Sequence, residues 1–224
     1  MKKFLTVALA GVLAASMLFT GCSKKAESKV PDKLIVGTNA EFPPFEYMND
    51  KKQPEGFDIA MIKEIGKRMG KKVEIKNMEF KSLIGAMESD SINAIIAGMT
   101  KTEKREKAVD FSDSYYTTNQ AIILKKDSKI TKLAQLDGKK IGVQEGTTGD
   151  LISSGDKFGD GKKAKVLVKG AKVKRFKKGV DAVMDLKNGS VDAVVIDELT
   201  ANEFVKKNAK KLKIVIDSAG SEYY

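Results

Sequence analysis

Short apolar runs alternate with segments of helical periodicity along most of this chain. The first folded element is an apolar run at Leu34–Val36, which is typical of a buried strand. From about Asp58 to Met69 the apolar residues recur at helical spacing, and Gly70 follows where the helix would end. The rest of the first half predicts a strand at 73–78, a helix at 82–88 and a buried strand at 94–97. Strands that alternate with helices indicate an α/β fold with largely parallel sheets.

The second half repeats this alternation. We expect strands at 141–143, 173–176, 193–196 and 212–216, and helices at 147–153, 180–186 and 199–206. The run 117–125 predicts a long strand between the halves, and 155–170, rich in glycine and lysine, predicts a surface excursion with a short strand at 166–168. An internal similarity between 91–96 and 190–195 supports two related lobes. Convergence on a common helix–turn–strand pattern explains that similarity equally well.

The first residues are typical of a secretory signal peptide, which we place at 1–21. Two lysines precede an apolar run at 4–19 that is too short and wrongly flanked for a stable membrane span. Leu18–Cys22 resembles a bacterial lipobox, which implies cleavage before Cys22 and lipid acylation of its thiol. Cys22 is the only cysteine, so the mature chain forms no internal disulfide. An ordinary signal peptide with an incidental cysteine is the alternative. Residues 22–32 are polar and suit a flexible tether.

The composition argues against several classes of site. The chain has no histidine, which removes the commonest metal ligand and the usual general base near neutral pH. We therefore expect no metal site, no serine–histidine triad and no cofactor. The net charge is +11 and falls to +9 without residues 1–21. The lysines are scattered among acids without interleaved aromatic residues, so they indicate a solvated basic surface rather than a nucleic-acid-binding one.

Polar residues cluster where the predicted strands end, which is where ligands bind in open α/β sheets. Asn39, Glu41 and Phe42 follow 34–36; Gly98, Thr100 and Arg105 follow 94–97; Gln144, Glu145, Gly146, Thr147 and Thr148 follow 141–143; and Asp197 follows 193–196. The second of these strands is preceded by Phe80. This placement is what makes the residues candidates for one site.

The clustered residues suit a zwitterion. A carboxylate prefers a planar bidentate donor such as Arg105, and backbone N–H groups such as those of a helix start at 146–148. An ammonium group prefers a carboxylate acceptor, which Asp197 offers at a strand end. We expect the rings of Phe42 and Phe80 to flank the rest of the ligand. Each residue also has an ordinary interpretation, as a surface cation, a helix cap or a core side chain.

Four ordered motifs run through the chain. They are Gly37–Tyr47 with Gly56–Ile59, Ala97–Thr100 with Thr102, Arg105 and Asp110–Ser112, Gly142–Thr148, and Val191–Asp197. Together they resemble the bacterial extracellular solute-binding proteins of family 3, the receptors of polar amino acid ABC importers. The resemblance covers essentially all of residues 33–224. It implies a two-lobed fold of the type II periplasmic-binding-protein kind, in which each lobe is a mixed, mostly parallel sheet with flanking helices.

The resemblance also implies how the chain is divided. Lobe 1 would span 33–119, lobe 2 would span 120–217, and 218–224 would be a second crossing between the lobes. In that family the chain then completes lobe 1 with a further strand and helix. The sequence stops on the return crossing, so we expect lobe 1 to lack its C-terminal completion and ligand binding to be weakened.

The resemblance assigns roles in ligand binding. It implies that Arg105 pairs with the α-carboxylate, helped by the main chain near Thr100 and at 147–148. It implies that Asp197 takes the α-ammonium, helped by the main chain at Gly98. The two phenylalanines would sandwich the ligand side chain.

Asn39 and Gln144 would line the end of the pocket that reads the side chain. Many family members have an acid where Asn39 stands, so these two residues favour a neutral polar ligand such as glutamine or cystine. Because Glu41 and Glu145 lie nearby in the sequence, lysine, arginine and histidine stay candidate ligands. The choice among these ligands is left open by the sequence.

We expect a monomeric receptor, not an enzyme, that closes its lobes around one free polar amino acid and meets the ABC permease subunits. Its place would be the extracellular face of the bacterial cell membrane, where the lipid anchor holds it. Two alternatives stay open. One is a secreted dehydratase-like enzyme on the same fold, with Glu41 and Glu145 as its candidate acids. The other is a ligand sensor or surface adhesin, because the same pocket serves each role.

Overall fold

The computed structural model describes residues 31–155 and 168–224, without the side chains of 217–223. Residues 32–224 form one compact unit. The predicted signal peptide, Cys22, the tether up to residue 30 and the strand residues 166–167 lie outside the described residues. Within the described ranges, no helix is both long and apolar enough to cross a bilayer.

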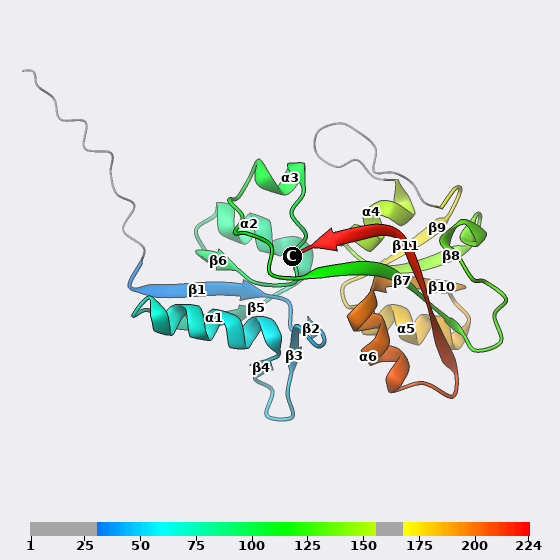
Figure 1. The fold of residues 1–224 in the computed structure, drawn as a ribbon, viewed down its shortest axis with the longest axis horizontal. Coiled ribbons are helices and arrows are strands. Elements are labelled where there is room, and N and C mark those ends of the chain that lie inside the picture. Colours follow the sequence, from blue (N-terminus) through cyan, green and yellow to red (C-terminus); the bar gives the residue numbers. More distant parts are fainter. Residues whose placement is uncertain (1–30, 156–167) are drawn as a thin grey trace, which may run out of the picture. The chain divides into compact units, whose positions relative to one another are not determined.

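The first sheet is parallel throughout and has the strand order β5-β1-β6 (Figure 1). Its strands are β1 (Lys33–Thr38), β5 (Lys72–Asn77) and β6 (Ala94–Ile95), and its helices are α1 (Phe57–Arg68) and α2 (Leu83–Glu88). Successive side chains of a strand point to opposite faces. Leu34 and Val36 therefore pack with Ile62 of α1, while Ile35 packs on the other face with Leu83 of α2.

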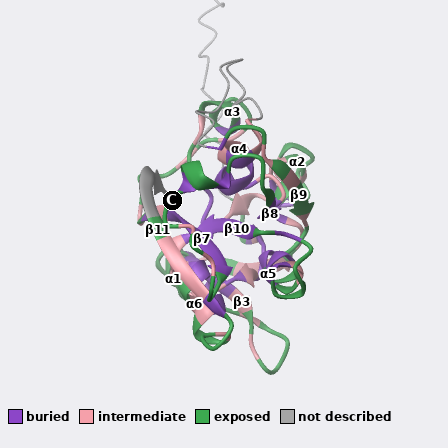
Figure 2. Ribbon diagram, turned by 90° about the vertical axis from the view of Figure 1, so that its right-hand side faces the viewer, coloured by how far each residue is buried: buried purple, intermediate pink, exposed green. Residues whose placement is uncertain are grey.

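The second sheet has the strand order β11-β7-β10-β8-β9. Its strands are β7 (Thr117–Lys125), β8 (Lys140–Gln144), β9 (Lys172–Phe176), β10 (Ala193–Asp197) and β11 (Leu212–Tyr223). Strands β9, β8 and β10 are parallel, and β7 is antiparallel to β10 and β11. The central strands β7 and β10 are almost wholly buried (Figure 2). These two strands thus form the buried centre of the second α/β unit.

Helices cover both faces of the second sheet. They are α4 (Thr148–Ser154), α5 (Gly179–Asn188) and α6 (Glu198–Lys206), together with the short 3₁₀ helix η2 (Leu133–Leu136). Residues of α5 and α6 pack with Ile123 and Ile196 on one face. Residues of η2 and α4 pack with Ile122 and Val195 on the other. Neighbouring residues of one strand thus face opposite layers.

The predicted alternation of strands and helices is confirmed in both halves, and β7 has the predicted bounds. The predicted strand at 94–97 ends at Ile95, and Met78 lies outside β5. The strand predicted at 212–216 continues to Tyr223, because β11 pairs with β7 again at 221–223 after a register shift between Ile216 and Ser221. The lobe boundaries at 119 and 217 and the missing completion of lobe 1 stay predictions.

Several short elements were not predicted. They are the antiparallel strands β2 (Glu41–Phe42), β3 (Glu46–Met48) and β4 (Pro54–Glu55), the 3₁₀ helix η1 (Phe80–Ser82) and α3 (Glu103–Glu106). Elements of two to four residues are too short to show a period in the sequence. Phe42 and Arg105 nevertheless reach their positions from two of them.

Close packing of α4 on β10 depends on Gly149. A Cβ atom there would lie 2.9 Å from Gln120 Oε1 and 3.0 Å from the Val195 carbonyl oxygen. We expect Gly149→Ala to lower the free energy of unfolding by about 1–3 kcal/mol, because overpacking forces the backbone to shift.

Gly85→Ala in α2 is the matched control. No atom lies within 4 Å of its Cβ position, so alanine there should raise the unfolding free energy by roughly 0.5–1 kcal/mol. Urea denaturation measures both variants. Equal stability of the two variants would contradict the close contact at Gly149.

Candidate ligand-binding site

Nine of the ten predicted ligand-binding residues line one small pocket. They are Phe42, Phe80, Gly98, Thr100, Arg105, Gln144, Thr147, Thr148 and Asp197. The tenth, Asn39, contacts a pocket residue: its Oδ1 accepts a hydrogen bond from Gln144 Nε2 at 2.7 Å, and its own Nδ2 donates to the Met78 carbonyl at 2.8 Å. The structure therefore brings together residues at the carboxyl ends of β8 and β10 and residues that follow β1 and β6 along the chain.

The walls of this pocket nearly fill it. Its volume is about 10 Å³, close to the space that one water molecule needs. One wall carries residues that follow the first sheet and the other carries residues of the second sheet. They touch where Arg105 Nη2 donates to the Gly146 carbonyl oxygen at 3.0 Å. A molecule the size of an amino acid enters only if these two walls move apart.

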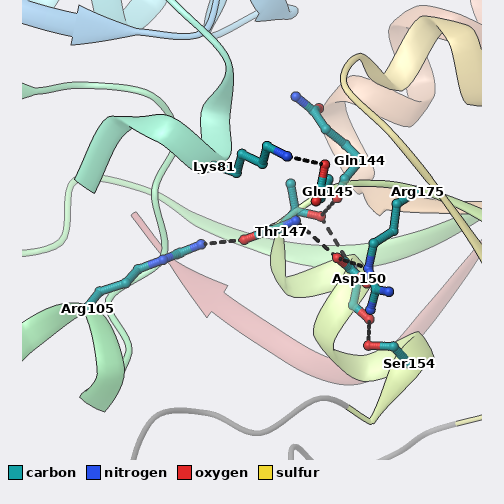
Figure 3. Close-up of polar contacts among 9 residues, drawn as sticks. Lys81, Arg105, Gln144, Glu145, Thr147, Asp150, Ser154 and Arg175 are labelled. Atoms are coloured by element: carbon teal, nitrogen blue, oxygen red, sulfur yellow. Dashed lines mark hydrogen bonds and ion pairs between the residues drawn. The ribbon is translucent and has the colours of Figure 1, made fainter. Parts of the chain in front are cut away.

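Arg105 reaches the pocket from α3. Thr102 caps this helix, and its Oγ1 accepts a hydrogen bond from the Arg105 N–H at 3.3 Å. The guanidinium is buried, lies 5.3 Å from the centre of the Phe80 ring, and donates to the carbonyl oxygens of Thr100 and Gly146. Figure 3 shows Arg105 reaching across to the turn that precedes α4. Its planar N–H groups are of the kind that binds a carboxylate at two points.

Asp150 holds the turn between β8 and α4. Its carboxylate accepts from the Gly146 N–H at 3.1 Å and from Arg175 Nε at 2.9 Å (Figure 3). Thr147 caps α4 through Oγ1, which accepts from the Asp150 N–H at 3.3 Å and donates to the Gln144 carbonyl at 2.8 Å. The predicted helix start is present, and these contacts fix the main chain along this wall.

Asp197 is buried at the end of β10. Its Oδ1 accepts from Gln120 Nε2 at 2.8 Å, and its Oδ2 accepts from the Tyr224 hydroxyl. Although Asp197 stands at the N-cap of α6, its side chain makes no capping hydrogen bond, so the helix-cap interpretation is wrong. Burial raises the pKa of Asp197, whereas the hydrogen bonds from Tyr224 and Gln120 and the charge of Arg105 act to lower it.

Sequence reasoning missed the two partners of Asp197. For Gln120 a signal existed, since it is a polar residue directly before the apolar run 121–124 of β7. Tyr224 carries no such signal. It reaches Asp197 because the end of the chain lies beside Tyr115 and Tyr116, with hydrogen bonds between their backbone groups.

The model of the bacterial extracellular solute-binding proteins, family 3, matches residues 34–222. This chain belongs to that family. The arginine-binding extracellular protein ArtP of Bacillus subtilis (strain 168) is 35% identical to it over 99% of this chain and 83% of ArtP. The arginine-bound form of truncated ArgBP from T. maritima is 41% identical, with a TM-score of 0.75 and 86% of each chain covered. An ancestral arginine-binding protein bound to glutamine is 42% identical, with a TM-score of 0.78 over 87% of this chain and 83% of that one.

The two-lobed α/β fold is shared with these family-3 structures. In this member, three ion pairs join the two sides of the pocket: Lys81–Glu145 at 2.9 Å, Lys177–Glu79 at 2.6 Å and Lys178–Glu41 at 2.7 Å. The first is visible in Figure 3. Glu41 and Glu145 are the acids that kept a cationic ligand open in the sequence. Lysine partners offset both of their charges.

Gln144 sets the polarity of one end of the family-3 pocket. Its Nε2 donates to Asn39 Oδ1 and, at 3.2 Å, to the Lys177 carbonyl. Its Oε1 is buried and has no hydrogen-bond partner among the described residues. This end therefore offers an acceptor for a donor group. Across the described ranges, no group of three or more acids or cysteines is arranged to hold a metal ion.

Proposed function

We propose that this chain binds one free polar amino acid in the pocket and presents it to the permease subunits of an ABC importer. The observation that carries the proposal is the presence of a buried guanidinium, Arg105, and a buried carboxylate, Asp197, in a single pocket. An α-carboxylate and an α-ammonium need these two partners at once. Relatives named for arginine binding support the same class of ligand.

Each wall would contribute main-chain groups as well as side chains. Arg105 would pair with the α-carboxylate beside the main chain of Thr100 and of 147–148. Asp197 would accept from the α-ammonium next to Gly98. The rings of Phe42 and Phe80, which both line the pocket, would flank the ligand side chain. These assignments are supported by the meeting of all the groups at one place.

Arginine and glutamine are the ligands we propose first. Both side chains carry N–H donors, and a donor would satisfy the unpaired Oε1 of Gln144. Leaving that buried acceptor unpaired penalises an apolar side chain. Two related proteins, one bound to arginine and one to glutamine, agree with this choice.

Binding would work by closure. The pocket is too small to admit a ligand in the present arrangement, so the walls separate before entry and meet again around the ligand. A ligand that binds the closed form better shifts the open–closed equilibrium toward it. Closure would also create the surface that the permease recognises.

Titration calorimetry of the purified chain tests the proposal. Arginine, glutamine, lysine, histidine and cystine are titrated separately, with leucine as the apolar control. We expect a binding signal with arginine, with glutamine or with both, and no signal with leucine. The bound amino acid should be chemically unchanged when it is recovered after the titration. No binding of any standard amino acid would contradict the proposal, and conversion of the ligand would favour the dehydratase alternative.

We further propose that Cys22 carries a lipid that holds the chain at the outer face of the bacterial membrane. Cys22→Ser should then release the chain into the medium or leave it unprocessed, because serine has no thiol to acylate. Membrane fractionation with labelled palmitate measures this change. Ser23→Ala beside it is the control and should stay in the membrane fraction. Equal membrane retention of the Cys22→Ser variant would contradict the anchor.

A further inference from the structure

Two acids of the sequence motifs lie outside the pocket and are fully buried. Glu46 of β3 and Asp58 of α1 are both 0% exposed. Unpaired charges are costly to remove from water, so a buried acid is expected to be neutral or closely paired. Neither residue has an ion pair with a lysine or arginine within the described ranges.

Asp58 is tied to the pocket wall. Its Oδ2 accepts from the Gly98 N–H at 2.8 Å and from the Tyr115 hydroxyl at 2.9 Å. Gly98 lines the pocket and has φ 49, a left-handed conformation that glycine adopts most easily. Asp58 therefore fixes the backbone of a pocket residue from outside the pocket.

Three oxygens of the two acids lack partners. Glu46 Oε1, Glu46 Oε2 and Asp58 Oδ1 are buried without a hydrogen-bond partner among the described residues. The Asp58 N–H donates to the carbonyl oxygen of Phe45 at 2.9 Å, which brings Asp58 to the segment that carries Glu46. As ionised groups, the two carboxylates would offer each other only acceptors and would repel. One proton removes the repulsion, because a protonated Glu46 can donate a hydrogen bond to Asp58 Oδ1.

The surrounding charges act in the same direction. Burial raises the pKa of Glu46 well above its ordinary value, and the charges of Asp58 from α1 and Asp197 from β10 raise it further. Burial also raises the pKa of Asp58, while the hydrogen bonds from Gly98 and Tyr115 lower it. The charged groups that raise the pKa of Glu46 are thus two acids, and both disfavour a negative charge on it.

We propose that Glu46 is protonated at neutral pH, donates a hydrogen bond to Asp58, and with it forms an acid pair that holds Gly98 at the pocket wall. This rests on the proposed function, because it takes the pocket as the ligand site. Glu46 and Asp58 are positioning residues, since neither lines the pocket. Ionisation of Glu46 would break the pair and loosen its hold on Gly98.

The variants Glu46→Gln and Glu46→Leu test whether Glu46 acts as a neutral hydrogen-bond donor or only fills space in the core. Glutamine keeps an N–H donor toward Asp58, so its ligand affinity should stay within about threefold of the natural chain's. Leucine leaves Asp58 Oδ1 unpaired, and we expect a loss of about tenfold or more. Equal losses in both variants would overturn the proposed donor.

A pH profile of the ligand-free protein tests the proton itself. Because the folded state holds this proton more tightly than the unfolded state, its stabilising effect is complete below pH 4.5, the ordinary pKa of the residue. It is lost as the pH rises through the raised pKa. Thermal unfolding of the natural chain should show this fall, and Glu46→Gln should lack that part of it.

Glu88→Gln, at an exposed acid at the end of α2, is the control and should follow the natural profile. A Glu46→Gln profile identical to the natural one would overturn the inference. A natural chain that binds no amino acid would contradict the proposed function instead. The unfolding profile still decides the protonation of Glu46 in that case, and amide exchange at Gly98, faster in Glu46→Leu than in Glu46→Gln, still decides its hold on the backbone.

Discussion

We expect the replacement of Arg105 with alanine to weaken amino acid binding by about 2–5 kcal/mol, because the ligand's buried carboxylate would lose its charged donor. The substitution has a second effect on the site. The guanidinium donates to the carbonyl oxygens of Thr100 and Gly146, which stand on opposite walls of the pocket. The closed arrangement therefore loses a link between its walls as well as a ligand contact. Calorimetry with the ligand identified by titration measures the loss.

Two neighbouring substitutions make this result specific. Lys104→Ala removes an exposed cation from the same helix and should change the affinity by less than about 0.5 kcal/mol. Arg105→Lys keeps the charge without the planar donor group, so an intermediate loss is expected. Unchanged affinity in Arg105→Ala, with an unchanged melting temperature, would place the ligand in another part of the protein.

Asp197→Asn has the second largest expected effect. It should weaken ligand binding without lowering the stability of the fold. Binding should weaken by about 2–5 kcal/mol, because the α-ammonium loses its carboxylate acceptor in a buried site. The fold should survive. Asparagine can still accept from Gln120 and can donate to the Tyr224 hydroxyl, the two groups that contact Asp197 now.

The stability sign follows from the raised pKa of Asp197. A carboxyl with a raised pKa in the folded state stabilises the fold below its unfolded pKa, and this stabilisation is lost as the pH rises. At neutral pH the ligand-free Asp197→Asn protein should therefore melt at the same temperature as the natural chain or higher. Asp181→Asn, an exposed acid of α5, is the control for both measurements. A variant that binds normally would contradict the role proposed for Asp197.

Most of the architecture could be predicted because buried strands and helices have characteristic patterns of apolar residues in the sequence. The apolar run 121–124 and the polar residues around it define β7, and helical spacing from Ile59 to Ile65 defines α1. The pocket residues could be found for a related reason. Parallel strands bring their carboxyl ends to one edge, so Gly98, Gln144 and Asp197 could be grouped without coordinates.

Partners across the fold could not be predicted in this way. The sequence shows Glu41 and Glu145 as acids near the pocket, but it does not show that Lys178 and Lys81 pair with them. Nothing in the sequence around a lysine indicates which distant acid it pairs with in the folded chain. Whether these two acids are neutralised therefore depends on how the two walls of the pocket meet.

Local patterns along the chain were enough to predict the α/β alternation, the positions of the main strands and helices, and most of the side chains around the pocket. These follow from periodicities and strand ends, which are local properties. The contact of Tyr224 with Asp197 and the position of Glu46 beside Asp58, behind Gly98, depend instead on how distant segments pack. Those contacts depend on the strand register of β11 and on the packing of β3 against α1. Many residues set both together, and no short stretch of sequence encodes either.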